Sequence, residues 1–349
     1  MKVLELTRHG SPQAAFALRI RPDPDPGPGQ VRIRVEASGV NFADVLARRG
    51  AYPEAPRPPC VIGYEVVGHI DALGPGVAQD PGAAALVLGQ RVLAFTRFGG
   101  YASCAVTSIL GTVPIPEDLD QRAAAALATQ GVTAYFATHE MVGMARGDLV
   151  LVQAAAGGVG NLIVQLARAQ GAVVAGTAGS DAKLELLRQL GVTYAINYCT
   201  HDFASELLRL SGGRRPDLIF DSIGGATAHK GFSLLATGGR IVNFGVADLA
   251  GGGWALPRAV RAFLSFGWIH PLALMLQSKG IVGVNLLRIA DERPEIVRRD
   301  MQAMVALAAR GALRPVVDRA FPAERVAEAH EHVESRRSMG KVVLRWEEK

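Results

Sequence analysis

The segment Leu149–Gln170 restricts the fold of this chain more than any other. An uninterrupted apolar run, Leu149–Val152, leads into a turn of small residues that ends at Gly160, and Asn161–Gln170 follows with helical spacing. An apolar strand that enters a glycine turn and continues as a helix begins a nucleotide-binding unit, because turn amides and the helix N-terminus can face a pyrophosphate. The segment therefore predicts a strand, a turn and a helix.

The turn matches the dinucleotide fingerprint GxGxxG in part. Ala155 stands in place of the first glycine, while Gly157 and Gly160 keep the second and third. A lone glycine motif is a weak signal, but here a strand precedes it, and a helix and a second strand follow. We predict that Gly157, Gly158, Val159 and Gly160 bind a dinucleotide pyrophosphate. The alternative is a glycine-lined turn without a ligand.

The same region also resembles a membrane span in one respect. Leu149–Ala167 carries no charge and is long enough to cross a bilayer. However, Gln153, Asn161 and Gln165 lie within it, and glycines cluster at its middle. A strand, a glycine turn and a helix explain this composition better than a span does.

The second strand of the unit indicates which dinucleotide binds. NAD-binding folds place an acidic residue at the end of this strand to hold the ribose hydroxyl, and Val173–Thr177 ends without one. The following turn supplies Gly179, Ser180 and Lys183, which suit the 2′-phosphate of NADPH. Asp181 weakens this interpretation unless it is the N-cap of the next helix, which we expect. The alternative for Lys183 is a solvated lysine on the helix face.

The pattern changes along the 349 residues from β-rich to alternating strand and helix. Alternation with continuously apolar strands is typical of a parallel sheet buried on both faces. We therefore predict an α/β protein in which a doubly wound domain, residues 126–288, is inserted into a β-rich domain formed by residues 1–125 and 289–349. The strands expected in the inserted domain are Leu149–Ala154, Val173–Thr177, Leu218–Ser222, Arg240–Phe244 and Ile281–Leu287.

Cysteine usage and charge restrict the partners and the compartment. Cys60, Cys104 and Cys199 form no CxxC pair, and no HExxH-like pair occurs, so we expect no metal and a reduced, cytoplasmic setting. The 37 basic and 32 acidic residues give a net charge of +5, and the basic residues are scattered. We therefore expect no nucleic-acid partner.

Motifs along essentially the whole chain resemble the zinc-independent quinone oxidoreductase branch of the medium-chain dehydrogenase/reductase superfamily. Within that branch, the chain is most similar to homologues of the vesicle amine transport protein. The motifs are Gly39–Asp44, Arg49–Pro53, Pro59–Val67, Ala154–Gly160, Ile115–Pro116, Asp221–Gly225, Asn243–Gly245 and Gly340–Leu344.

The resemblance implies a GroES-like catalytic domain, a Rossmann domain that binds NADPH, and hydride transfer to quinones or α,β-unsaturated carbonyls. Zinc-dependent relatives carry a Cys early in the first motif and a His before a Glu in a later one. This chain has Ser38 and Asn41 around the first position and Tyr64 at the second. The cysteine-rich loop that holds the structural zinc of those relatives is also missing, so both zincs of those relatives should be absent. A small hydrophobic carbonyl or quinone is the implied substrate, and a homodimer the implied assembly.

The resemblance also assigns roles to single residues. Asn41 and Tyr52 would line the active cleft. Our own hypothesis is that either Asn41 or Tyr52 hydrogen-bonds the oxygen that gains charge, while the proton comes from Tyr52 or from water. Other roles are a loop cap for Asn41 and a packed turn aromatic for Tyr52. The implied coenzyme contacts are Thr133 at the nicotinamide end, Lys183 and Tyr198 at the 2′-phosphate, and Phe244 with Gly245 at the carboxamide.

A second class of function stays open, a binding or membrane-trafficking factor of the vesicle-protein type that kept the fold without the activity. Its candidate segment is Ala262–Ser278, an apolar stretch that would be a lid, a dimer contact or a membrane-facing element. The Ala-rich stretch Pro81–Leu88 has no assigned role.

Overall fold

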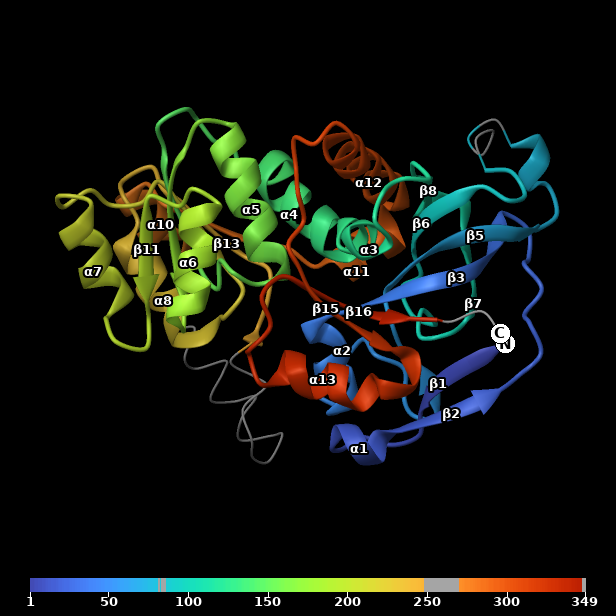
Figure 1. Cartoon of the computed structure of the whole chain (residues 1–349). Coiled ribbons are helices and arrows are strands. Elements are labelled where there is room, and N and C mark those ends of the chain that lie inside the picture. The colour runs from blue at the N-terminus through green and yellow to red at the C-terminus, as the bar shows by residue number, and fades with distance from the viewer. Residues whose placement is uncertain (81, 83–85, 248–269, 347–349) are drawn as a thin grey trace. The chain divides into compact units, whose positions relative to one another are not determined.

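The computed structural model describes residues 1–80, 82, 86–247 and 270–346 (Figure 1). The chain forms two compact units, one from Met1–Val132 with Leu286–Lys349 and the other from Thr133–Asn285. Of the segments left open above, residues 81, 83–85 and 262–269 lie outside the described residues.

The unit Thr133–Asn285 contains a six-stranded sheet in which every strand pairing is parallel. The order is β11-β10-β9-β12-β13-β14, so the first strand, β9, lies inside the sheet and the order reverses beside it. With right-handed crossovers, the helices that follow β9 and β10 lie on one face of the sheet, and those that follow β11 and β12 lie on the other, as in doubly wound folds. The strands are β9 Leu149–Val152, β10 Val173–Ala178, β11 Tyr194–Asn197, β12 Leu218–Asp221, β13 Arg240–Asn243 and β14 Gly280–Gly283.

Helices of this unit follow the strands in alternation (Figure 1). Buried residues of β9, β10, β12 and β13 form a core with apolar side chains of α7 and α8. The helices are α4 Val132–Tyr135, α5 Gly158–Ala169, α6 Asp181–Gln189, α7 Phe203–Leu210, α8 Gly225–Leu234 and α10 Pro271–Gln277.

The other unit is rich in antiparallel strands. Its larger sheet has the order β15-β16-β3-β5-β6-β8, with β7 also paired to β3, and its smaller sheet has the order β2-β1-β4. Because β16 pairs with β3, the end of the chain completes a sheet begun near its start. The strands are β1 Lys2–Leu6, β2 Phe16–Ile20, β3 Gln30–Val40, β4 Cys60–Val61, β5 Glu65–Leu73, β6 Arg91–Phe95, β7 Cys104–Ser108, β8 Thr112–Pro114, β15 Val317–Pro322 and β16 Lys341–Arg345.

Helices of this unit are short except for one. The α-helices are α1 Pro12–Ala15, α2 Phe42–Arg48, α3 Gln121–Ala125, α11 Leu286–Glu292, α12 Pro294–Ala309 and α13 Val326–Glu334. A π-helical segment, η4 Leu127–Gly131, follows α3, and a second, η5 Phe136–Glu140, follows α4 in the other unit.

The predicted fold class is confirmed, with two local corrections. The strand predicted at Ile281–Leu287 ends at Gly283, and Leu286 begins α11, whose Leu287 is buried. Asp181 is the first residue of α6, and the N-cap is Ser180, so the predicted cap position was wrong. Leu149–Ala167 is a strand, a turn and a helix, and none of the helices in the described ranges combines the length and apolarity that a bilayer crossing needs.

Candidate functional site

The glycine turn after β9 needs glycine because the chain passes close to itself. A Cβ on Gly160 would lie 2.5 Å from the carbonyl oxygen of Ala154 and 2.8 Å from the Cα of Ala155. Gly157 is the N-cap of α5 and has no side chain that could cap it. The first N–H groups of α5 are therefore not capped by that residue, and such groups favour an anion at the helix N-terminus.

Polar side chains around the turn fix its shape. The amide of Asn161 donates to the carbonyl oxygens of Gly157 and Gly158 at 2.7 and 2.8 Å. On the strand side, the Thr177 hydroxyl donates to Oε1 of Gln153 at 2.7 Å and accepts from the Ala154 N–H at 3.2 Å. These hydrogen bonds therefore fix the conformation of the turn between β9 and α5.

Buried polar atoms without partners gather at the carboxyl edge of this sheet. Among the described residues, Nε2 of Gln153, Oδ2 of Asp221 and Oδ1 of Asn243 have no hydrogen-bond partner. These residues follow or end the neighbouring strands β9, β12 and β13. Burial raises the pKa of Asp221 to about 6, although its other oxygen accepts two backbone N–H groups. Unpaired buried groups are costly, so this edge is built for a polar ligand.

The turn after β10 brings the predicted residue Gly179 against Tyr198, which directly follows β11. A Cβ on Gly179 would lie 2.6 Å from the hydroxyl of Tyr198, so the tyrosine lies directly over this glycine. The side chain of Ser180 is exposed and does not cap α6, and Lys183 lies one turn further along that helix. The segment after this strand, which has no acid at its end, therefore carries a serine and a lysine, and the phenol of Tyr198 lies over its glycine.

The remaining predicted coenzyme residues also lie in this unit. The N–H of Phe244 donates to the carbonyl oxygen of Asp221 at 3.0 Å. A Cβ on Gly245 would lie 2.6 Å from the carbonyl oxygen of Ser222, so the chain passes close to the end of β12 here. Thr133 is buried in α4.

In the other unit, Asn41 lies at the centre of a buried hydrogen-bond network. Its Nδ2 donates to Oε1 of Glu65 at 2.8 Å. Its Oδ1 accepts from Nζ of Lys341 at 2.9 Å and from Nε2 of Gln130 at 3.2 Å. Lys341 and Glu65 also form an ion pair in which both side chains are 0% exposed. Sequence reasoning missed this network, except for Asn41 itself.

A second carboxyl group lies beside this pair. Asp44 is buried and accepts the N–H groups of Asn41 at 2.8 Å and Gly63 at 3.1 Å. Burial, with the charge of Glu65 as a smaller cause, raises the pKa of Asp44 to about 8. Asp44 therefore stays protonated at neutral pH, and the one ammonium of Lys341 balances Glu65.

Tyr52 belongs to an aromatic group in the same unit. Its ring meets that of Tyr64 edge-on, with centroids 6.4 Å apart, and Tyr64 lies 5.3 Å from Phe98. Burial raises the pKa of Tyr52 to about 12 and that of Tyr64 still further. Both phenols are therefore protonated donors at neutral pH. The Tyr64 hydroxyl has no hydrogen-bond partner among the described residues.

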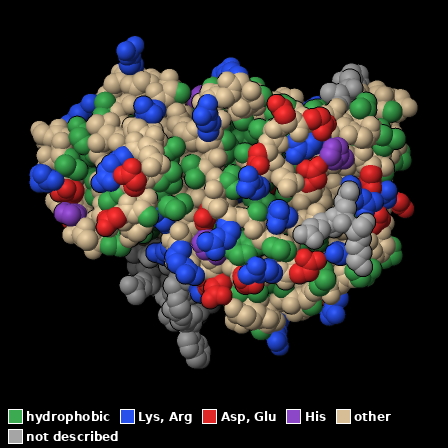
Figure 2. Space-filling view, in the orientation of Figure 1, with side chains coloured by type: hydrophobic (Ala, Val, Ile, Leu, Met, Phe, Trp, Pro, Cys, Tyr) green, Lys and Arg blue, Asp and Glu red, His purple; other side chains and the backbone are tan. Residues whose placement is uncertain are grey.

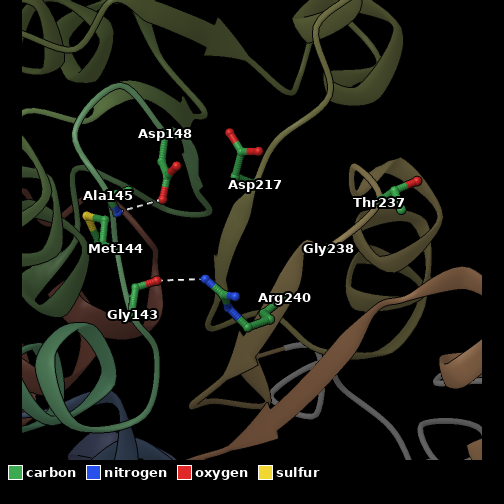
Figure 3. Close-up of a pocket in the computed structure, with 8 residues that line it drawn as sticks. All are labelled: Gly143, Met144, Ala145, Asp148, Asp217, Thr237, Gly238 and Arg240. Atoms are coloured by element: carbon green, nitrogen blue, oxygen red, sulfur yellow. Dashed lines mark hydrogen bonds between the residues drawn. The ribbon is translucent and has the colours of Figure 1, made fainter.

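One open cavity of about 420 Å³ lies within the unit Thr133–Asn285 (Figure 3). It is lined from the turns before β9, β12 and β13, at the sheet edge opposite the glycine turn. Arg240 reaches the carbonyl oxygen of Gly143 at 2.6 Å, and Asp148 accepts the N–H of Ala145 at 2.8 Å. These bonds hold the turns in place. Because the cavity lies at the sheet edge opposite the glycine turn, we do not assign the coenzyme to it.

Surface charge gives no nucleic-acid signature on the face that Figure 2 shows. Basic and acidic side chains are interspersed over that face. Many of the surface pairs are local, such as Arg209 with Glu206 and Arg325 with Glu328. A basic stripe along one element would be the signal for a nucleic acid.

Comparisons with known proteins agree with this arrangement. Residues 27–141 match the alcohol dehydrogenase GroES-like domain, and residues 190–344 match a family described as zinc-binding dehydrogenase. The human synaptic vesicle membrane protein VAT-1 homolog is 34% identical over 89% of this chain and 77% of its own length. The zebrafish homolog is 31% identical, and the matched region spans 63% of its length.

Enzymes are also among the relatives. A 2-haloacrylate reductase from a Burkholderia species is 34% identical, over 88% of each chain, and rat quinone oxidoreductase is 32% identical over 89% and 87%. The solved structure of Escherichia coli quinone oxidoreductase with NADPH has a TM-score of 0.85 at 25% identity, covering 99% of this chain and all of that one. The chain therefore belongs to the medium-chain dehydrogenase/reductase superfamily of oxidoreductases.

Proposed function

We propose that this protein is an NADPH-dependent reductase of quinones or α,β-unsaturated carbonyls that works without zinc. The observation that carries the proposal is the pairing of an uncapped glycine turn with unsatisfied buried polar atoms at the same sheet edge. Relatives named quinone oxidoreductase and 2-haloacrylate reductase support the substrate class.

The residues present fit a phosphorylated nicotinamide coenzyme, which supplies hydride when bound. Gly157–Gly160 would hold the pyrophosphate with backbone N–H groups at the start of α5. Ser180, Lys183 and Tyr198 would hold the 2′-phosphate. Thr133 and the segment Phe244–Gly245 would hold the nicotinamide end.

Reduction of a quinone or an enone places negative charge on an oxygen, which a neutral donor can stabilise. Asn41 has one Nδ2 hydrogen beyond the bond to Glu65, and Tyr52 is a protonated phenol at neutral pH. We assign the oxygen contact to these two side chains. The proton would come from Tyr52 or from water.

Zinc does not fit the residues of this unit. Ser38 and Asn41 lie around the position where the resemblance places the Cys ligand, and Tyr64 stands where it places the His ligand. A hydroxyl, an amide and a phenol are poor replacements for these ligands. The ammonium of Lys341, bonded to Glu65 and Asn41, would also repel a second cation. Elsewhere in the described ranges, Asp23, Asp71 and Cys104 have metal-like spacing, but Arg34 pairs with both aspartates, and burial raises the pKa of Cys104 to about 11.

Anaerobic NADPH oxidation with a panel of quinones, enones and 2-haloacrylates tests the proposal. We expect turnover on at least one class, with a preference for NADPH over NADH. Elemental analysis of the active protein should give zinc well below one ion per chain. Absence of turnover on every acceptor would refute the catalytic assignment, and stoichiometric zinc would refute the metal-free mechanism.

A second candidate function is a membrane-associated trafficking factor, because four relatives are named synaptic vesicle membrane protein VAT-1 homolog. In the described part of Ala262–Ser278, α10 exposes 75% of Met275 and 79% of Leu276. Co-sedimentation with liposomes tests it, with Met275→Asp/Leu276→Asp as the matched variant. Binding that the variant abolishes would favour the membrane role. Equal sedimentation of the two proteins would leave α10 with no such role.

We propose a cytoplasmic homodimer as the working form. The three cysteines are unpaired, as expected for a reducing compartment. Among the strands of the described residues, β14 ends the sheet order, and an edge strand can pair with a second copy. Light scattering of purified protein should give twice the chain mass, and a monomer across the micromolar range would contradict the assembly.

A further inference from the structure

The hydrogen bonds around Asn41 admit a single orientation of its amide. The oxygen side faces two donors, Nζ of Lys341 and Nε2 of Gln130, while the nitrogen side faces the carboxylate of Glu65. Rotating the amide by half a turn would set its NH₂ against both donors and its oxygen against the carboxylate. All three contacts would become repulsive, so the orientation follows from the donor and acceptor types.

The two charged partners make this orientation strong. Lys341 on β16 and Glu65 on β5 are both 0% exposed. Their two strands lie on either side of β3, and β3 ends directly before Asn41. Charge-assisted hydrogen bonds are stronger than neutral ones, and burial strengthens them further. The three strands therefore hold the amide from both sides.

The chain makes room for the ion pair at Gly39. A Cβ on Gly39 would lie 2.6 Å from both Cε and Nζ of Lys341 and would overlap Oε1 of Glu65. Gly39 is on β3 and does not have a left-handed backbone, so the requirement for glycine here is steric. The space beside Asn41 is reserved for this lysine and this carboxylate.

We propose that Lys341 and Glu65 are positioning residues that fix the Asn41 amide and so direct its remaining Nδ2 hydrogen. The inference rests on the proposed function, in which Asn41 donates to the substrate oxygen. The ammonium on Oδ1 also withdraws electron density from the amide, which makes its N–H a better donor. Gln130 supports the same orientation with a neutral hydrogen bond.

The kinetic test uses a paired replacement, Lys341→Met/Glu65→Gln, because a single replacement would leave a lone buried charge. We expect kcat of the paired variant for the quinone to fall about 10- to 100-fold, because the Nδ2 hydrogen of Asn41 would no longer be held toward the substrate oxygen. The Kd for NADPH should stay unchanged. Val343→Ala is the matched control, since Val343 is fully buried on β16 and is absent from the network. Gly39→Ala, which keeps both charges and removes their space, should reproduce the loss.

A double-mutant cycle with Asn41→Ala separates positioning from general destabilisation. If the ion pair acts through Asn41, adding Asn41→Ala to the paired replacement costs little further activity. Losses that multiply, or a paired variant with the kcat of the Val343→Ala control, would overturn the proposal.

Selective ¹⁵N labelling distinguishes this inference from the proposed function. The chain has five asparagines, so the Asn41 side-chain amide can be assigned by substitution. We expect two separate Nδ2 proton signals with slow solvent exchange, and faster exchange in Lys341→Met/Glu65→Gln. A freely exchanging amide in the unchanged protein would overturn the inference. A fixed amide together with full activity of Asn41→Ala would instead overturn the role of Asn41 in the proposed function.

Discussion

Tyr101 and His330, 229 positions apart, share a hydrogen bond of 3.1 Å between the tyrosine hydroxyl and Nε2 of the imidazole. Both side chains are buried, and the two rings meet edge-on with centroids 5.8 Å apart. Phe16 packs against the imidazole from the β2 side at 4.8 Å. The bond ties α13 to the smaller sheet, because the Tyr101 carbonyl also accepts the N–H of Leu4 on β1.

This contact predicts a loss of stability in mild acid. Burial, with a smaller effect of Arg48, lowers the pKa of His330 from 6.5 to about 3. Between pH 6.5 and pH 3 the unfolded chain therefore binds one more proton than the folded chain. The contribution of the neutral His330 to the free energy of unfolding is complete above pH 6.5 and is lost as pH falls toward 3. From pH 7 to pH 5 the loss is about 2 kcal/mol.

His330→Gln should reduce the loss of stability between pH 7 and pH 5, because glutamine can accept a hydrogen bond from Tyr101 without titrating. Urea unfolding of both proteins at pH 5, 6 and 7 measures the difference in the free energy of unfolding. The raised pKa of Asp44 acts in the opposite direction, since its stabilisation falls as pH rises toward 8, but it is common to both proteins. Equal pH slopes would show that His330 is not the group responsible.

Lys183→Ala should weaken NADPH binding while leaving NADH unaffected. A charge-assisted bond to the 2′-phosphate contributes about 1.5–3 kcal/mol, which corresponds to a roughly 10- to 150-fold rise in Kd. Fluorescence titration with both coenzymes measures this ratio. Arg188→Ala on the same helix is the control, since Arg188 pairs with Glu185 at the surface. The same loss for both coenzymes would show that Lys183 does not contact the phosphate.

Gly160→Ala should abolish coenzyme binding. The added Cβ would meet backbone atoms of Ala154 and Ala155, which cannot move without opening the turn. We expect a destabilisation of about 1–3 kcal/mol and a loss of NADPH affinity of at least about 10-fold. Gly143→Ala is the matched control, because a Cβ there meets nothing within 4 Å. Unchanged binding by Gly160→Ala would contradict a pyrophosphate site at this turn.

The spacing of apolar residues along the chain was sufficient to predict the parallel sheet. It failed where one apolar run contains the end of a strand and the start of a helix. Strands β9, β10, β12 and β13 are short apolar runs bounded by polar or glycine residues, and the structure contains all four. The run Ile281–Leu287 is apolar except for Gly283 and Asn285, which lie where the strand ends and α11 begins. Its second part forms α11 because Leu287 is buried there, a tertiary preference that periodicity over seven residues does not reveal.

The network around Asn41 was beyond sequence reasoning for a different reason. Lys341 lies 300 positions from Asn41, in a closing strand whose lysine looks like an exposed terminal charge. Only the pairing of β16 with β3 brings the two together. A buried lysine is rare unless it is paired, so its partner, Glu65, has to be known before its burial can be expected.

Two phenol removals distinguish a reacting tyrosine from a packing tyrosine. We expect Tyr52→Phe to lower kcat for the quinone about 10- to 100-fold, because a protonated phenol that donates to the substrate oxygen would be lost. Tyr64→Phe should leave the free energy of unfolding unchanged or raise it by up to about 1 kcal/mol, since its buried hydroxyl has no partner among the described residues. Steady-state kinetics and urea unfolding of both variants measure these effects. The reverse pattern, with kcat lost only in Tyr64→Phe, would reassign the donor from Tyr52 to Tyr64.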